Sequence, residues 1–364
     1  MIKAADTFAT PLDYARLSQD DLVERIRDRK AELNAVILGH NYQRLEIQSV
    51  SDYLGDSLGL SQEAAATDAD VIVFCGVHFM AETAKILSPK KTVLMPDLRA
   101  GCPMADFVTA QSLRKLKQLQ PTAAVVAYVN STAAVKAESD VCCTSANAVK
   151  IVDSFPRDRT ILFVPDKNLA DYTAKKTGRP IRSASEFLRD GADQDVEPGT
   201  VIAWDGYCYV HDDLVLTELA EAREKYPHAK VIIHPEARAD LLAQADYVAS
   251  TSGMADIAAQ HEAVIIGTER GLIDRLQARF PEKTIVPLSR AAICGNMKVN
   301  TIAKLAWCLD HKQHELIMPE DVRIRAESAL RRMLDLSQGW GEKRTPEQEK
   351  LELAGVGARG CGCA

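Results

Sequence analysis

Three cysteines stand far apart in the sequence at positions that could hold a metal: Cys102, Cys208 and Cys294. Soft thiolate ligands select zinc, copper(I) or iron–sulfur clusters. A structural zinc site normally takes four ligands, often in close pairs, and no such pairing surrounds these cysteines. If the fold brings the three thiols together, they could hold a 4Fe-4S cluster and leave one iron without a protein ligand. That iron could act as a Lewis acid on a substrate hydroxyl or carboxylate.

The other interpretation of widely spaced cysteines is that they are small buried hydrophobes. It fits Cys75, Cys142, Cys143 and Cys308, which lie within strand or helix patterns. For Cys102, Cys208 and Cys294 the choice between the two depends on whether the fold makes them converge.

Side chains suited to acid–base chemistry end three similar apolar segments. The pairs are His40 and Tyr42, Tyr128 and Asn130, and His234 and Glu236. Ligands of open α/β sheets bind at the carboxyl ends of the strands, so these side chains share one site if the three strand ends converge. They offer protonatable groups, a phenol, an amide and a carboxylate, with too few apolar side chains for a packing role.

The three segments belong to an internal repeat. The strand patterns begin at Ala35, Ala123 and Lys230. An aspartate recurs twelve residues after each of His40, Tyr128 and His234, and a hydroxyl follows five residues later. The aspartates are Asp52, Asp140 and Asp246, and the hydroxyls belong to Ser57, Ser145 and Thr251. Both spacings hold three times without a gap, so the sequence predicts a triplicated unit.

Further strands complete each repeat. Second strands are predicted at 71–74, 161–164 and 264–266, and third strands at 92–95, 200–204 and 284–286. One of the three widely spaced cysteines follows each third strand. Helical patterns at 61–67, 80–87, 146–153 and 255–261 separate the strands, and this alternation indicates parallel βαβ units.

The predicted fold class is therefore α/β, with three three-layer α/β/α lobes of small parallel sheets. A pseudo-threefold axis relates the lobes, and the cluster and active site lie on it. The first lobe covers 1–104 with an N-terminal helix at 17–33, the second 105–209 and the third 210–298. The second repeat is longer, and its extra length at 175–198 is expected to be a surface loop with a short helix.

The chain after the third repeat divides into two parts. The helical stretch at 301–338, within a segment 299–344, is expected to pack back on the first lobe. Residues 345–364 are expected to form a flexible tail. The tail carries Cys361 and Cys363, a pair that could bind metal or respond to oxidation, although a passive tail fits equally well.

The hydroxyls of Ser57, Ser145 and Thr251 each open a helical pattern. Helix N-termini with free N–H groups bind anions, so three such ends around one site suit a polyanionic substrate. The alternative is that they are ordinary helix caps, each contributing about 1 kcal/mol to its helix.

Composition limits the class of protein. The 364 residues are 46% hydrophobic and 26% charged, which is typical of globular domains. The net charge of −7 and the lack of a basic block argue against nucleic acid as a partner. No apolar run is long enough to cross a membrane, and the start has no secretory pattern, so a cytoplasmic location and a small-molecule substrate are expected.

Several motifs of the chain resemble those of one known family, quinolinate synthase of the 4Fe-4S type A. The resemblance runs from about residue 33 to residue 304. The matching motifs are Gly39-His-Asn-Tyr-Gln43, Gly55-Asp-Ser-Leu58, Phe79-Met-Ala-Glu-Thr-Ala-Lys85, Tyr128-Val-Asn130, Cys143-Thr-Ser-Ala-Asn147, Gly206-Tyr-Cys-Tyr-Val-His211, His234-Pro-Glu236, Ser250-Thr-Ser-Gly253 and Cys294-Gly-Asn-Met-Lys298.

The resemblance implies an activity and a cofactor. Quinolinate synthase condenses iminoaspartate with dihydroxyacetone phosphate, releases phosphate and two waters, and makes quinolinate for de novo NAD biosynthesis. Its single 4Fe-4S cluster is held by three cysteines, which correspond to Cys102, Cys208 and Cys294. An L-aspartate oxidase or dehydrogenase is expected to supply the iminoaspartate. The chain is expected to be a monomer or homodimer.

The resemblance also implies site residues. The substrate site would be lined by His40, Ser57, Tyr128, Asn130, Ser145, His234, Glu236 and Thr251. We expect Glu236, with His234, to move protons and Tyr42 to serve ring closure or dehydration. His211 either contacts substrate or stands behind the residues that do.

Two other functions remain open at this stage. One is a different 4Fe-4S dehydratase that acts on a hydroxy acid, which leaves the three anion-binding helix ends without a role. The other is a non-enzymatic redox or metal sensor that uses Cys361 and Cys363.

Overall fold

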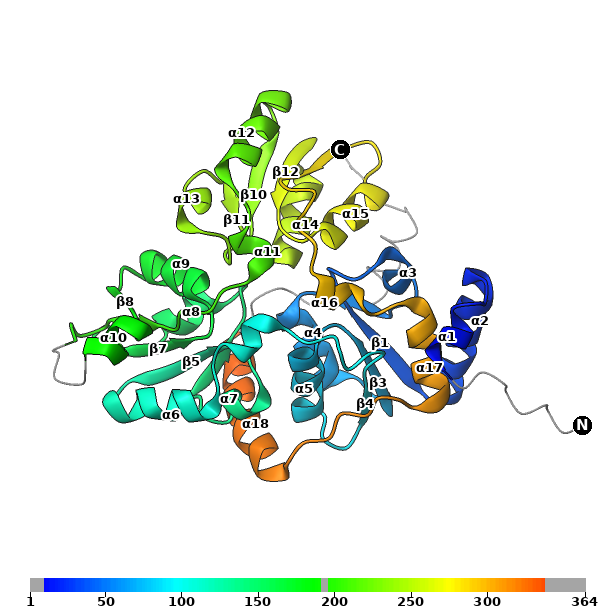
Figure 1. The fold of residues 1–364 in the computed structure, drawn as a ribbon, viewed down its shortest axis with the longest axis horizontal. Helices are drawn as coiled ribbons and strands as arrows, with labels where there is room; N and C mark the ends of the chain where they lie inside the picture. The colour runs from blue at the N-terminus through cyan, green and yellow to red at the C-terminus, as the bar shows by residue number, and fades with distance from the viewer. Residues whose placement is uncertain (1–9, 191–195, 338–364) are drawn as a thin grey trace, which may run out of the picture.

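The computed structural model of the chain describes residues 10–190 and 196–337. Three lobes surround a common centre and give the molecule a triangular outline (Figure 1). Each lobe contains one all-parallel sheet with helices against it, so the predicted α/β class with three lobes is confirmed. The sheets have four, five and four strands. The lobe boundaries given above stay a prediction.

The first lobe has strand order β2-β1-β3-β4. Its strands are β1 (Ala35–His40), β2 (Tyr53–Gly55), β3 (Val71–Cys75) and β4 (Thr92–Leu94). Its helices are α1 (Pro11–Tyr14), α2 (Gln19–Glu32), α3 (Leu45–Gln48), α4 (Ser57–Ala66), α5 (His78–Leu87) and the 3₁₀-helix η1 (Pro103–Asp106). The buried runs of Val, Ile and Leu in β1 and β3 suit a parallel sheet that is covered on both faces.

The second lobe repeats this order and adds one strand, in the order β6-β5-β7-β9-β8. Its strands are β5 (Ala124–Tyr128), β6 (Val141–Cys143), β7 (Ile161–Val164), β8 (Ile181–Ser183) and β9 (Val201–Ala203). Its helices are α6 (Ala110–Leu119), α7 (Ala133–Lys136), α8 (Ala148–Asp153), α9 (Lys167–Thr177) and α10 (Ala184–Asp190). The predicted insertion therefore contains the expected short helix, α10, and also an edge strand, β8, that the sequence did not reveal.

The third lobe has the order β11-β10-β12-β13. Its strands are β10 (Lys230–Ile233), β11 (Tyr247–Val248), β12 (Ala263–Gly267) and β13 (Thr284–Pro287). Its helices are α11 (Tyr209–Asp212), α12 (Leu216–Lys225), α13 (Ala239–Leu242), α14 (Thr251–Gln260), α15 (Arg270–Arg279) and α16 (Gly295–Lys298). All three lobes contain a short edge strand, β2, β6 or β11, that was not predicted.

The repeated aspartates fix these edge strands. Asp52 Oδ2 accepts a hydrogen bond from Ile37 N–H at 2.7 Å, and Asp140 and Asp246 accept in the same way from Val125 at 2.7 Å and Val231 at 2.8 Å. Each aspartate N–H also donates to the carbonyl of the same strand residue. The spacing that revealed the repeat therefore has a structural role at the sheet edge.

Two helices follow the third lobe, α17 (Ile302–His311) and α18 (Glu320–Leu336). The whole stretch was expected on the first lobe. α17 lies there, because Leu305 and Leu309 share a core with Ile37 and Val73. α18 instead lies between the first two lobes, against α5, α7 and β6 (Figure 1). The predicted tail with Cys361 and Cys363 lies outside the described residues.

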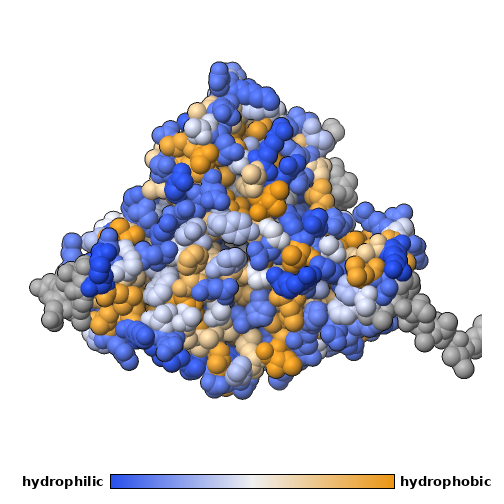
Figure 2. Space-filling model, in the orientation of Figure 1, coloured by the Kyte–Doolittle hydropathy of each residue, from blue (hydrophilic) through white to orange (hydrophobic). Residues whose placement is uncertain are grey.

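The cores show how the lobes are joined. One apolar cluster is continuous through the first and second lobes and α18, whereas the third lobe has two clusters almost entirely of its own. The third lobe therefore shares little apolar core with the other two. Hydrophilic and hydrophobic side chains alternate over the face shown in Figure 2. No helix among the described residues is long and apolar enough to span a membrane.

Candidate active site

The carboxyl ends of the first strand of each repeat meet at the centre of the molecule. β1 ends at His40, β5 at Tyr128, and His234 follows β10 directly. All three side chains are buried, as is Glu236. Because each strand end belongs to a different lobe, the fold gathers at one point residues that are far apart in the sequence.

Glu236 is the hub of this centre. Its Oε1 accepts a hydrogen bond from the Tyr128 hydroxyl of the second lobe. Its Oε2 lies 2.7 Å from His211 Nδ1 and 3.8 Å from His234 Nδ1. The rings of His211 and His234 stack with centroids 4.4 Å apart. A carboxylate with this many partners is held in one orientation.

The charges of the centre follow from burial. Burial alone would raise the pKa of Glu236, but His234, His211 and the Tyr128 hydrogen bond outweigh it and lower the pKa to about 2. Burial lowers the pKa of both His40 and His234 to about 3. At neutral pH Glu236 is thus ionised, and the imidazoles of His40 and His234 are neutral. Burial, followed by the charge of Glu236, raises the pKa of Tyr128 well above its usual value, so its phenol stays protonated.

His211 connects the carboxylate to a first-lobe tyrosine. Its Nε2 lies 2.9 Å from Thr268 Oγ1 and 3.3 Å from the Tyr42 hydroxyl. The Tyr42 and Thr268 hydroxyls are 2.6 Å apart, and the Tyr42 ring stands edge-on to His40. A chain of exchangeable protons therefore runs from Tyr42 through Thr268 and His211 to Glu236.

The three cysteine loops are tethered in the same way in all lobes. The first N–H of α5, α9 and α15 donates to the carbonyl two residues before the cysteine. The pairs are His78 to Ala100 at 2.7 Å, Lys167 to Gly206 at 2.8 Å and Arg270 to Ala292 at 2.9 Å. The triplication therefore extends to the backbone that positions each thiol.

The cysteines themselves occupy equivalent places. Cys102, Cys208 and Cys294 each directly precede a four-residue helix, η1, α11 or α16, where free N–H groups favour negative charge. All three are partly buried. Burial raises the pKa of each thiol, and the charge of Glu236 and then those of Cys102 and Cys294 raise the pKa of Cys208 further.

This donor set fits an iron–sulfur cluster better than a single ion. Among the described residues, the one close group of metal-ligating atoms is Cys208 with His211 and Glu236, all within 4.8 Å of one another. The three cysteine sulfurs are thus more widely spread than the ligands of one ion. Three thiols around a pseudo-threefold centre suit an iron–sulfur cluster, which is larger than one ion and binds a thiolate at each of several irons.

The predicted anion-binding hydroxyls differ in their placement. Ser57 and Thr251 are the first residues of α4 and α14, but Asp56 and Ser250 cap those helices. Ser145 lies in the turn before α8, which begins at Ala148. Ser57 lines a small hollow with Val129, the residue between Tyr128 and Asn130 in the chain. The expected threefold equivalence of the helix starts therefore holds for two lobes.

Buried neighbours of these hydroxyls join the lobes. Thr251 Oγ1 accepts from Asn41 Nδ2 at 2.9 Å, and Ser250 donates to Asp56 at 3.0 Å. Asn130 carries a buried Oδ1 atom that has no hydrogen-bond partner among the described residues. An unpaired buried acceptor in the centre suits a bound ligand or water.

The sequence analysis missed several residues that the structure places at this centre. Thr268 and Glu269 follow β12, and Asp166 follows β7 at the same position of its repeat as Glu269. Asn168 Nδ2 donates to the Glu236 carbonyl at 3.0 Å and so joins the second lobe to the third. Their position in the sequence, directly after the second strand of a repeat, is the signal that could have identified Thr268, Glu269 and Asp166.

The four cysteines predicted to be structural, Cys75, Cys142, Cys143 and Cys308, are fully buried, which confirms that prediction.

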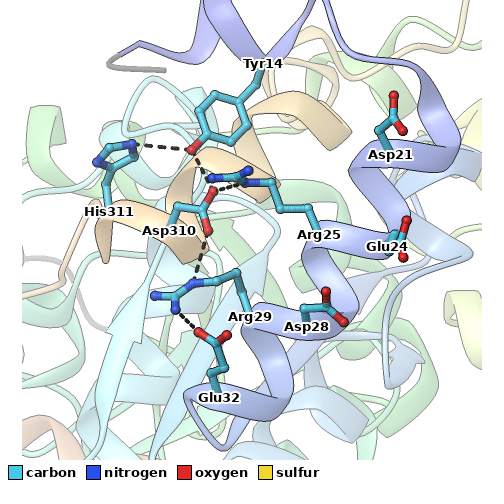
Figure 3. A pocket seen from close by; sticks show the side chains of 9 residues that line it. All are labelled: Tyr14, Asp21, Glu24, Arg25, Asp28, Arg29, Glu32, Asp310 and His311. Atoms are coloured by element: carbon cyan, nitrogen blue, oxygen red, sulfur yellow. Dashed lines mark hydrogen bonds and ion pairs between the residues drawn. The ribbon is translucent and has the colours of Figure 1, made fainter. Parts of the chain in front are cut away.

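A separate hollow of about 560 Å³ lies on the outer side of the first lobe, between α1, α2 and α17. Figure 3 shows Arg25, Arg29 and the Tyr14 hydroxyl converging on Asp310. Glu32 pairs with Arg29, whereas the other acidic side chains of α2 point away. The basic groups of this hollow are thus paired with protein carboxylates, and it is distinct from the centre where the lobes meet.

The fold and the centre define a class: three-lobed parallel α/β proteins with one buried polar centre and a cysteine loop from each lobe. A family model described as Quinolinate synthetase A protein matches residues 24–335. The chain belongs to the quinolinate synthase family.

Curated relatives agree with this family over nearly their full length. The chain is 49% identical over 320 residues to Quinolinate synthase 1 of Methanosarcina acetivorans, covering 87% of this chain and 98% of the relative. It is 47% identical over 319 residues to a quinolinate synthase of Desulforudis audaxviator, covering 87% and 99%. A quinolinate synthase of Trichodesmium erythraeum is 44% identical over 325 residues, covering 87% and 94%.

Proposed function

We propose that the chain makes quinolinate for NAD biosynthesis by joining iminoaspartate to dihydroxyacetone phosphate, with release of phosphate and two waters. Family membership over most of the chain supports the activity. The observation that carries the site assignment is the convergence of Glu236, Tyr128 and three thiols from separate lobes. An oxidase or dehydrogenase acting on L-aspartate would supply the iminoaspartate.

Cys102, Cys208 and Cys294 would hold one 4Fe-4S cluster. Bound there, the cluster supplies a Lewis-acidic iron for dehydration. The half-buried position of the thiols and their spread around the centre support this assignment. The cysteines must lose their protons to bind iron, so loading releases protons and is favoured at higher pH.

Glu236 would accept and return protons during the imine and enamine steps. It is ionised in a buried setting, and its two oxygens are aligned by Tyr128 and His211. His234, which is neutral and 3.8 Å away, can take up a proton from substrate and then pass one on to Glu236.

Tyr42 would act as a proton donor in ring closure or dehydration. Burial raises the pKa of its phenol well above the usual value, so the proton is retained until a basic oxygen forms next to it. His211 and Thr268 stand in line to replace that proton.

The remaining residues would bind and orient the substrates. Ser57, Ser145 and Thr251 would hold carboxylate and phosphate oxygens, and His40, Tyr128 and Asn130 would position the carbon skeleton. The unpaired Oδ1 of Asn130 supports a contact with an N–H or O–H group of the substrate.

The first test is iron and acid-labile sulfide per chain, with Mössbauer spectra, on anaerobically purified protein. About four irons are expected, because one cubane contains four. Cys208→Ala should lose the cluster, whereas Cys142→Ala, at a buried cysteine away from the ligand loops, should keep it. Quinolinate formation from the two substrates should follow cluster content.

Little iron after anaerobic reconstitution, or zinc in its place, would contradict the cluster assignment. A loaded protein that forms no quinolinate would contradict the activity. The two results are separate, so each part of the proposal can fail by itself.

A further inference from the structure

Two charged residues lie between the first lobe and the cysteine loop of the third lobe. Glu269 caps α15 and is fully buried, and Lys298, the last residue of α16, has 17% of its side chain exposed. Lys298 Nζ lies 3.1 Å from Glu269 Oε1 and 3.2 Å from Oε2. A carboxylate this deeply buried persists only when a cation and hydrogen bonds satisfy it.

Glu269 holds the third-lobe cysteine loop through the backbone. Its Oε1 accepts from Cys294 N–H at 3.1 Å, and its Oε2 accepts from Gly271 N–H at 2.6 Å. The equivalent caps of the other lobes act differently. Val77 has no carboxylate, and Asp166 accepts from Leu169 N–H instead. The hydrogen bond between the cysteine loop and the cap of the preceding helix is thus found in the third lobe and not in the equivalent places of the other two.

Lys298 connects Glu269 to the first lobe. Its Nζ donates to the carbonyl oxygen of Tyr42, and Arg44 Nε donates to the Lys298 carbonyl at 2.9 Å. A Cβ at Gly271 would lie 2.6 Å from both Lys298 Nζ and the Tyr42 carbonyl oxygen. Glycine at 271 therefore allows the two lobes to approach closely enough for this contact.

The other end of Tyr42 is held by the neighbour of Glu269. The Tyr42 hydroxyl lies 2.6 Å from Thr268 Oγ1. Two consecutive residues, Thr268 and Glu269, therefore hold Tyr42 at its hydroxyl and, through Lys298, at its carbonyl. Of these two residues, Glu269 also binds the Cys294 loop through Cys294 N–H, so Tyr42 and this loop are held from one short segment.

We propose that Glu269 and Lys298 form a positioning pair that fixes the Tyr42 side chain relative to the Cys294 loop during turnover. The inference rests on the proposed role of Tyr42 and on the proposed cluster. The polar contacts of the two side chains are with one another and with backbone groups, so the pair would act through where it places Tyr42.

The test compares turnover per cluster in Lys298→Met with that in Lys30→Met. Lys30 is a matched control, because its Nζ pairs with Asp52 at 2.5 Å, its side chain is 21% exposed and its helix, α2, lies at the outer edge of the first lobe (Figure 1). Lys298→Met should lower kcat per cluster about ten- to a hundredfold with little change in KM, since a misplaced group costs rate. Lys298→Arg should restore part of the loss, and Lys30→Met should keep full turnover.

A double-mutant cycle shows whether the pair acts through Tyr42. In a Tyr42→Phe background the hydroxyl is already gone, so adding Lys298→Met should lower kcat by less than about twofold. If the fold losses in kcat of Tyr42→Phe and Lys298→Met multiply in the double variant, the inference is overturned. Normal turnover per cluster in Lys298→Met would overturn it as well. A purely structural role would reduce iron content and melting temperature but leave turnover per cluster unchanged.

Lys298→Met leaves a buried carboxylate unpaired and could prevent folding. The Lys298→Met/Glu269→Gln double variant removes both charges and keeps an acceptor oxygen for one of the two backbone N–H groups. It should fold, load iron and show the same loss of kcat as Lys298→Met. Unchanged turnover in the double variant would also overturn the inference.

Two other results would contradict the proposed function on which this inference rests. Absence of iron in the wild-type protein would contradict the cluster assignment, and full activity of Tyr42→Phe would contradict the role given to Tyr42. Either failure would remove this inference too.

Discussion

The Tyr128 hydroxyl of the second lobe donates a hydrogen bond to Glu236 Oε1 of the third lobe. The two residues are 108 positions apart in the chain, and both are buried. This contact ties the proposed proton carrier to a neighbouring lobe. The carboxylate is therefore correctly oriented only when the lobes are assembled.

Replacement of Glu236 by Gln should leave the cluster in place and remove turnover. Gln has nearly the same shape but cannot accept a proton, and the loss of a general base typically costs about 10²- to 10⁴-fold in rate. Quinolinate formed per cluster and iron per chain are the two measurements. Glu218→Gln, elsewhere in the third lobe, is the control. Turnover retained by Glu236→Gln would remove Glu236 from the acid–base role.

His40 makes the stability of the protein depend on pH. Burial lowers its pKa to about 3, whereas an unfolded histidine titrates near 6.5. The contribution of neutral His40 to the free energy of unfolding is fully present above pH 6.5. It is lost as the pH falls from 6.5 toward 3, because the histidine of the unfolded chain takes up a proton first. Between pH 7.5 and 5.5 this group should remove about 1 kcal/mol of the free energy of unfolding.

Denaturant titrations of His40→Gln at the two pH values check this expectation. The variant should lose less stability on acidification than the parent, by about that amount. His228→Gln, at an exposed histidine, should show the parent's pH dependence. An equal slope for the parent and His40→Gln would show that His40 is not held neutral by burial.

The repeat could be predicted from the sequence because it is recorded in local patterns. The Val and Ile runs of the buried strands and the spacing from His40 to Asp52 are visible without a structure. The edge strand β11 could not be seen, since Tyr247–Val248 is too short to have a periodicity. Its existence depends on Asp246 binding the neighbouring strand.

The site was predictable only in part, for a related reason. His40, Tyr128 and His234 end recognisable strands, so their meeting follows from the fold. Lys298 and Tyr42 are 256 residues apart, and nothing in the sequence around either residue predicts their contact. Such contacts depend on how the lobes dock, which a single sequence does not record.

The sheet-edge role of the repeated aspartates can be tested at Asp140. Asp140→Ala removes the acceptor of the buried Val125 N–H and should lower the free energy of unfolding by about 1 kcal/mol. Asp140→Asn retains an acceptor oxygen and should lose much less. Thermal unfolding of the two variants measures the difference, and turnover per cluster should be normal in both. An equal loss in Ala and Asn would place the effect elsewhere than in this hydrogen bond.

Asp166 should destabilise the protein at neutral pH. It is fully buried, one of its oxygens has no hydrogen-bond partner among the described residues, and burial followed by the charge of Glu236 raises its pKa well above the usual value. A raised pKa favours the folded state below about pH 4, and this contribution is lost as the pH rises toward the folded-state pKa, because the unfolded chain ionises first. Asp166→Asn cannot ionise, so it should raise the free energy of unfolding at pH 7 by about 1–3 kcal/mol.

Denaturant titrations at pH 4 and pH 7 separate this effect from a general change in packing. The gain from Asp166→Asn should be present at pH 7 and small at pH 4, where about half of the unfolded aspartate is already protonated. Asp171→Asn, on the exposed side of the same helix, breaks an ion pair with Lys175 and should change stability by less than about 1 kcal/mol at either pH. Asp166→Asn also keeps an oxygen for Leu169 N–H, so its cap on α9 is preserved. A loss of stability at pH 7 would mean that Asp166 is ionised in the folded protein, and that a cation or water compensates its charge.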